Sequence, residues 1–139
     1  YFTRTLVIGA TRGWAKGVLL WNLALDEKYG PHKGGCGDCR GVVTINSKTG
    51  AVTRNVEYYA LAHASRFVRP GAHRIASTSG SASGGLDTVA FRNTDGAIAL
   101  LVANPAKAAR AFSVRMKGSS FGYTLPASSV ATFTWNDAP

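Results

Sequence analysis

The second half of the chain is a series of short β-type runs separated by turn-forming residues, and this pattern restricts the possible folds most strongly. The runs from residue 72 onward are AHRIAS, LDTVAFRN, AIALLVAN, ARAFSVRM, SFGYTLP and SVATFTW. Segments rich in Gly, Pro, Asn, Asp and Ser separate several of them: STSGSASGG, NTDG, NPAKA, KGS and PASS. Such residues favour turns, and short strands at regular spacing are typical of a β-sandwich or a β-barrel.

Apolar and polar residues alternate in several of these runs, as expected for strands with one buried face. Val89 and Phe91 are predicted to face one way, and Thr88 and Arg92 the other. The alternation recurs in residues 112–125. We therefore predict an all-β region in the second half of the chain.

The first half has a different pattern, in which helical and strand-like segments follow one another. Residues 2–11 have helix-compatible apolar spacing, and residues 18–25, VLLWNLAL, form a continuous apolar run of strand length. Such runs are typical of strands that are buried on both faces of a sheet. The glycine-rich segment DEKYGPHKGGCGDCRG follows, and loops of this length are uncommon unless they are functional or disordered.

A hairpin and a helix complete the first half. The β-branched runs GVVTIN and AVTRN, joined by SKTG, predict a β-hairpin. Asn55 is predicted to cap a helix with the sequence VEYYALAHASRFV, which RPG ends. We interpret His63, on this helix, as a packed or interfacial histidine. The change of pattern near Pro70 predicts two domains, residues 1–70 and residues 71–139.

Composition narrows the possible functions. The net charge is +9, but the basic residues are scattered singly, without a basic helix or the stacked aromatics of an RNA-binding sheet. We therefore expect a solvated basic surface and no nucleic-acid partner. No apolar run approaches the roughly 20 residues that span a bilayer, so no transmembrane segment is predicted. The chain begins at Tyr1 with what reads as mid-domain sequence, and we expect it to be a piece of a longer protein.

The cysteines Cys36 and Cys39 lie in the segment GGCGDCRG and allow three interpretations. A zinc site needs about four ligands, and the chain adds only scattered histidines to this single pair. A thioredoxin-like site would open a helix, whereas a strand-like run follows here. A disulfide that pins the loop is the interpretation we adopt, with reduced thiols as the alternative; a disulfide would imply an oxidising compartment.

The motifs WNLALDE, GGCGDCRGVVTIN and TGAVTRNVEYYALAHASRFVRPGAHRIAS, with the later VAFRNTDG and YTLPASSVATFTW, resemble the C-terminal part of glycoside hydrolase family 30. That family holds glucosylceramidases and endo-β-1,6-glucanases. Its enzymes have a (β/α)₈ TIM barrel fused to a β-sandwich. The resemblance implies that residues 1–70 contain barrel strand eight, a long loop and the final barrel helix, and that residues 71–139 form the β-sandwich.

The resemblance also implies a substrate-binding site at Trp21 and Asn22. Sites in such barrels lie at the C-terminal ends of the strands, and the tryptophan of the family's W-N-x-A-L motif lines the subsite of the sugar that is cleaved. A flat indole ring is suited to stack on a sugar face. The alternative is that Trp21 only packs the barrel.

Catalytic residues are expected to be absent from this chain. Family members are retaining enzymes with two catalytic glutamates about 5 Å apart, at the ends of barrel strands four and seven, which would precede residue 1. The glutamates Glu27 and Glu57 match neither position. The resemblance thus implies an exported β-glycosidase whose partners are a carbohydrate or glycolipid substrate and the rest of the barrel. It implies no metal and no cofactor, and the chain alone is expected to be inactive.

Two functions from other classes remain as alternatives. A stand-alone carbohydrate-binding β-module would need exposed aromatic residues on one face of the sandwich, and Tyr123, Phe133 and Trp135 are the candidates. A basic protein that binds nucleic acid or a membrane surface is the other alternative, based on the net charge alone.

Overall fold

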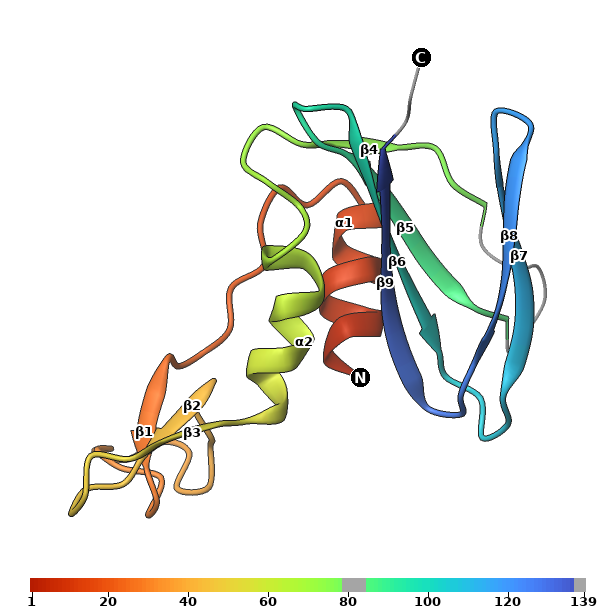
Figure 1. The fold of residues 1–139 in the computed structure, drawn as a ribbon. Coiled ribbons are helices and arrows are strands. Elements are labelled where there is room, and N and C mark those ends of the chain that lie inside the picture. The colour runs from red at the N-terminus through yellow and green to blue at the C-terminus, as the bar shows by residue number, and fades with distance from the viewer. Residues whose placement is uncertain (79–84, 137–139) are drawn as a thin grey trace.

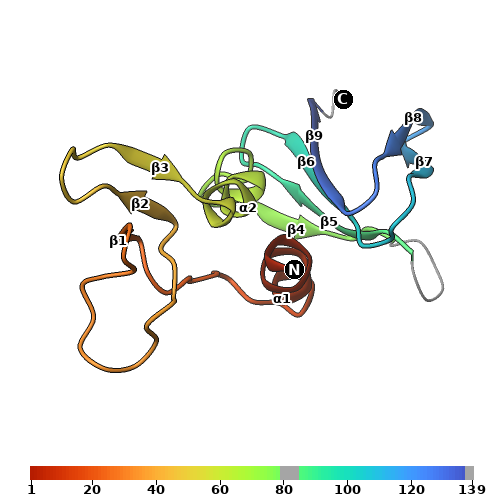
Figure 2. The ribbon, with the colours of Figure 1, turned by 90° about the horizontal axis from the view of Figure 1, so that it is seen from below.

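The computed structural model describes residues 1–78 and 85–136. Helices cover one face of a four-stranded sheet, and a two-stranded hairpin covers the other (Figure 1). The view from below shows the same order of layers, with a small three-stranded unit extending away from them (Figure 2). None of the described helices is long and apolar enough to cross a membrane.

The four-stranded sheet has the order β4-β5-β6-β9, and all of its pairs are antiparallel. Its strands are β4 (His73–Ile75), β5 (Asp87–Arg92), β6 (Ala97–Asn104) and β9 (Ser129–Asn136). The covering hairpin consists of β7 (Arg110–Met116) and β8 (Ser119–Leu125). Each β-type run predicted from the sequence therefore forms a strand. The predicted turn over residues 77–85 lies mostly outside the described residues.

The sheet has a hydrophobic core on each face. Val89 and Phe91 of β5 pack with Leu101 of β6 on the helix side. Ala90 and Val102 face the hairpin and pack with other apolar residues there. Val89 and Phe91 share one face of β5, as predicted. The opposite face is buried as well, with Thr88 8% exposed and Ala90 5% exposed, because the hairpin covers that side.

The helical layer comes from both ends of the first half. It consists of the π-helix η1 (Phe2–Gly9), the short helix α1 (Ala10–Arg12) and helix α2 (Val56–Ser65). Val7 and Ile8 of η1 are buried in the core on the helix side. The helix expected near the N-terminus is present. Asn55 is the N-cap residue of α2, but its side chain makes no capping bond and donates instead to the Gly41 carbonyl at 2.8 Å.

The three-stranded unit contains β1 (Ala24–Asp26), β2 (Val43–Ile45) and β3 (Val52–Arg54). Strands β1 and β2 are parallel, and β2 and β3 are antiparallel. The predicted β-hairpin is therefore present as β2 and β3.

The strand predicted over residues 18–25 is wrong in extent, because it is present only from Ala24 onward. A strand needs a hydrogen-bonded neighbour, and residues 18–21 pair with no strand in the described part of the chain. The expected burial on both faces is wrong as well: the exposed fractions of Leu19 and Leu23 are 98% and 74%.

Candidate functional site

A cavity of about 410 Å³ lies where several parts of the three-stranded unit meet the start of α2. Its walls come from the start of η1, the segment before β1, the turn after β1, the cysteine loop and the first turn of α2. The residues that line it include Trp21, Tyr29, Asp38, Arg40 and Glu57. The structure thus places the sequence-predicted Trp21 beside polar residues from three other segments.

Trp21 has an exposed indole, whereas Asn22 is held by backbone contacts. The exposed fraction of Trp21 is 85%. The Asn22 side-chain oxygen accepts from the Ala24 N–H at 3.3 Å, and its carbonyl accepts from the Val42 N–H at 2.9 Å. Trp21 is therefore available to stack on a flat ligand, and Asn22 fixes the backbone next to it.

Asp26, at the end of β1, organises the turn that carries Tyr29. Its Oδ1 accepts from the backbone N–H groups of Lys28 at 2.8 Å and Gly30 at 2.7 Å. Tyr29 has a φ of 62°, which a non-glycine residue adopts rarely. The two hydrogen bonds that Asp26 accepts stabilise the conformation of this turn and thereby set the position of Tyr29 at the cavity.

Glu27 is tied to the hairpin turn. Its carboxylate accepts from the Ser47 hydroxyl at 2.7 Å and from the Ser47 N–H at 2.8 Å. These hydrogen bonds lower the pKa of Glu27 to about 2. A general acid must carry a proton at the working pH, so Glu27 in this arrangement is unsuited to that role.

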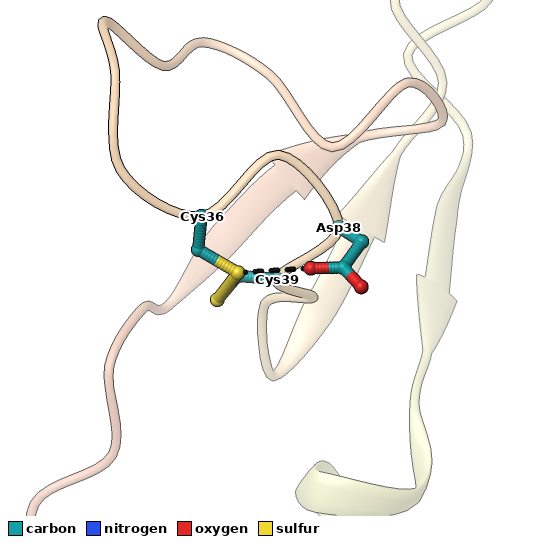
Figure 3. Close-up of a disulfide and its surroundings, with 3 residues drawn as sticks. All are labelled: Cys36, Asp38 and Cys39. Atoms are coloured by element: carbon teal, nitrogen blue, oxygen red, sulfur yellow. Dashed lines mark hydrogen bonds between the residues drawn. A yellow bond between two sulfur atoms is a disulfide. The ribbon is translucent and has the colours of Figure 1, made fainter.

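Within the loop between β1 and β2, a disulfide joins Cys36 to Cys39, as the sequence predicted (Figure 3). Asp38, between the two cysteines, has its Oδ1 3.1 Å from the Cys36 sulfur. No group of three or more potential metal ligands occurs among the described residues. Cys39 itself lines the cavity, so the disulfide fixes part of its wall.

Arg40 and Glu57 form an ion pair that the sequence analysis missed. Arg40 Nη2 donates to Glu57 Oε1 at 3.0 Å. The hydrogen bond and the negative charge of Glu57 raise the pKa of Arg40 above its usual value. Glu57 is 9% exposed, and its Oε2 has no hydrogen-bond partner in the described part of the chain. Two features of the sequence could have suggested this contact: an arginine directly after the cysteine pair, and a glutamate in the first turn of the predicted helix.

The aromatic residues proposed for a stand-alone carbohydrate module form a packed cluster. Tyr123 and Phe133 have ring centroids 5.2 Å apart, and Phe121 lies 5.9 Å from Trp135. Most of these pairs meet edge to face, a favourable packing geometry. The rings contact one another between the hairpin and β9. Phe133 and Trp135 are half-buried against the core, whereas Tyr123 is 45% exposed.

Comparison with known proteins identifies the sandwich. Residues 71–133 match the family model of the glycosyl hydrolase family 30 beta sandwich domain. The chain belongs to glycoside hydrolase family 30. The resemblance inferred from the sequence motifs is thereby confirmed, and the β-sandwich expected from it is present.

The similar proteins include several endo-1,6-β-glucanases. Endo-1,6-beta-D-glucanase neg1 of Aspergillus fumigatus is 36% identical over 132 residues, which cover 91% of this chain and 27% of the relative. Endo-1,6-beta-D-glucanase BGN16.3 of Trichoderma harzianum is 38% identical over 72% of this chain and 21% of its own length. The structure of the endo-beta1,6-glucanase BT3312 is 38% identical, with a TM-score of 0.87 over 98% of this chain and 30% of that one. The chain thus spans less than a third of the length of these proteins.

Proposed function

We propose that this chain is the C-terminal part of a secreted, retaining endo-β-1,6-glucanase and supplies part of its sugar-binding cavity. One observation carries the proposal: the structural match to an endo-β1,6-glucanase covers 98% of the chain, hence both of its halves. A likeness confined to the sandwich would support only a shared accessory domain. Between the two substrates that the family resemblance implies, glucosylceramide and β-1,6-glucan, the named relatives favour the glucan.

In this proposal residues 1–70 are the last β/α unit of a (β/α)₈ barrel, and residues 71–139 are the β-sandwich. Exposed apolar side chains around the three-stranded unit support this division: Leu19, Leu23, Val52 and Val56 are 98%, 74%, 61% and 59% exposed. Exposed apolar groups of this size are costly in water. The remaining barrel strands would cover them and would give residues 18–23 their missing neighbours.

Trp21 is the proposed wall of the subsite that holds the cleaved sugar. Hydrolysis with retention uses one carboxylate as nucleophile and another as acid and base. Both glutamates are proposed to lie upstream of residue 1, because Glu27 and Glu57 are engaged with Ser47 and Arg40. The chain's contribution is then to orient the glucan beside those carboxylates, which accelerates the reaction through positioning.

The test measures hydrolysis of β-1,6-glucan by the longer enzyme that contains this chain. Trp21→Ala should lower kcat/KM by roughly 30- to 1,000-fold, since it removes about 2–4 kcal/mol of transition-state binding. Trp14→Ala is the matched control, because Trp14 is also exposed, at 75%, but stacks on Arg74 away from this cavity. An unchanged kcat/KM in a folded Trp21→Ala variant would show that Trp21 only packs the barrel.

A further inference from the structure

Arg40 is the cationic side chain of the cavity that Trp21 lines, and its position is fixed from three sides. The disulfide ends at Cys39, directly before it. Gly41, directly after it, lies so close to β1 that a Cβ there would be 2.9 Å from the Leu25 nitrogen. Only glycine fits this approach. The backbone of Arg40 is thus held on both sides, and the hydrogen bond to Glu57 anchors Nη2 of its guanidinium group.

The guanidinium group has donors left over for a ligand. Arginine has five N–H donors in a planar arrangement, and the hydrogen bond recorded for Arg40 uses one nitrogen, Nη2. The side chain is 46% exposed, so part of it faces the cavity. Asp38, on the same wall, adds a carboxylate that accepts hydrogen bonds. Donors and an acceptor beside an exposed indole suit a neutral sugar, which presents hydroxyl groups at its edge and C–H groups on its face.

Glu57 determines how Arg40 is presented. The Glu57 side chain is 11% exposed, which prevents it from turning into solvent. Its only recorded partner among the described residues is Arg40. A buried carboxylate is strongly disfavoured without a charged partner, so the pair is expected to persist when a ligand enters.

We propose that Arg40 donates hydrogen bonds to hydroxyl groups of the β-glucan chain at the cavity beside Trp21, and that Glu57 is the positioning residue that holds Arg40 for this contact. The inference rests on the proposed function and adds a second substrate-binding residue to the cavity. The competing role is a structural clamp, in which the ion pair only ties the cysteine loop to α2.

The test compares KM and kcat of the longer enzyme on β-1,6-linked gluco-oligosaccharides. Arg40→Ala should raise KM about tenfold and change kcat less than threefold, because it removes a hydrogen bond that is made equally to the substrate and to the transition state. Arg40→Lys should recover part of the loss, since lysine keeps the charge but not the planar donor geometry. Glu57→Gln should give an intermediate rise in KM. Arg54→Ala is the control, because Arg54, on β3, lies over the ring of Tyr58 on α2 and does not line the cavity.

The outcomes separate this inference from the proposed function. A wild-type enzyme that does not hydrolyse β-1,6-glucan rejects the proposed function. If Trp21→Ala impairs hydrolysis but Arg40→Ala leaves KM unchanged, the role of Arg40 is rejected and the proposed function stands. A structural clamp would lower the unfolding temperature of Arg40→Ala without changing the KM of the folded fraction. If Arg40→Ala does not fold, unchanged KM values in both Arg40→Lys and Glu57→Gln overturn the inference.

Discussion

Strand β6 and the segment that leads into β1 are both rich in apolar residues, yet they lie in opposite surroundings. In β6, Leu101 and Val102 are fully buried, one on each face of the central sheet. Before β1, Leu19 and Trp21 are 98% and 85% exposed. The two segments have similar composition, and what differs is whether the chain itself supplies the layers that cover them.

The difference separates a part of the molecule that is covered within the chain from a part that is not. Helices and a hairpin cover the central sheet within this chain, and its buried apolar area stabilises it. The three-stranded unit has short strands and exposed apolar side chains, which are features of regions with low local stability. The three-stranded unit is suited to a binding site that additional strands of the proposed barrel would complete. The sandwich is suited to hold that unit in position.

Hydrogen exchange of the isolated chain should show the largest contrast between the two regions. Amides of β6, such as Leu101 and Val102, should exchange only through global unfolding, which for domains costs about 5–15 kcal/mol. The amides of Val42 and Val43 donate to the carbonyls of Asn22 and Leu23, yet they should exchange through local opening at a much lower free energy.

Equal protection of the two sets of amides would contradict this expectation. It would mean that the three-stranded unit folds together with the sandwich and its helical layer as one cooperative unit and needs no further strands. Repeating the measurement on the longer enzyme provides the control, because there the amides of Val42 and Val43 should become protected.

Much of the sandwich could be predicted from the sequence because its determinants are local. Alternation in residues 88–92 and turn-forming residues between the runs specify strands and their boundaries without knowledge of distant contacts. The hairpin of β2 and β3 follows from its turn: Asn46 Oδ1 accepts from the Thr49 N–H at 2.9 Å, and Gly50 has a φ of 71°.

The contacts of the candidate site could not be predicted in the same way. Arg40 and Glu57 are separated by 17 positions, and Glu27 and Ser47 by 20. Such pairs depend on how the loop folds back on the hairpin, and the periodicity of apolar residues in the sequence does not predict this. The extent of β1 was missed for a related reason: an apolar run shows that a strand is possible, but the presence of its neighbours decides whether one forms.

A matched pair of leucine substitutions should give the second-largest effect. Leu101→Ala empties a fully buried position and should lower the free energy of unfolding of the chain by about 2–5 kcal/mol. Leu19→Ala changes an exposed side chain and should lower it by less than about 0.5 kcal/mol. Urea unfolding of the purified variants measures both values.

The same pair tests the proposed barrel contact. In the longer enzyme Leu19→Ala should become destabilising as well, because the proposed strands would cover Leu19. If Leu19→Ala remains neutral there, the segment before β1 is exposed in the enzyme too, and the proposed barrel unit is wrong.

The smallest effect should come from His63, which joins α2 to β9. The Thr132 hydroxyl donates to the His63 backbone carbonyl at 3.0 Å. The Thr132 hydroxyl oxygen is also 3.0 Å from His63 Nδ1. Because the single hydroxyl hydrogen is directed to the carbonyl, Nδ1 is the donor in this second hydrogen bond. Burial lowers the pKa of His63 below its ordinary value of 6.5.

The unfolded chain therefore binds a proton at a higher pH than the folded chain does. It follows that the stability contributed by neutral His63 is complete above about pH 6.5 and decreases as the pH falls towards the folded-state pKa. Urea midpoints measured from about pH 7.5 to pH 5 should decrease in wild type, and His63→Gln should flatten this part of the curve. His32→Gln, which replaces an exposed histidine in the loop after β1, is the control for the substitution itself. If His63→Gln keeps the full wild-type slope, other groups cause the pH dependence, and the contact between α2 and β9 does not respond to protonation of His63.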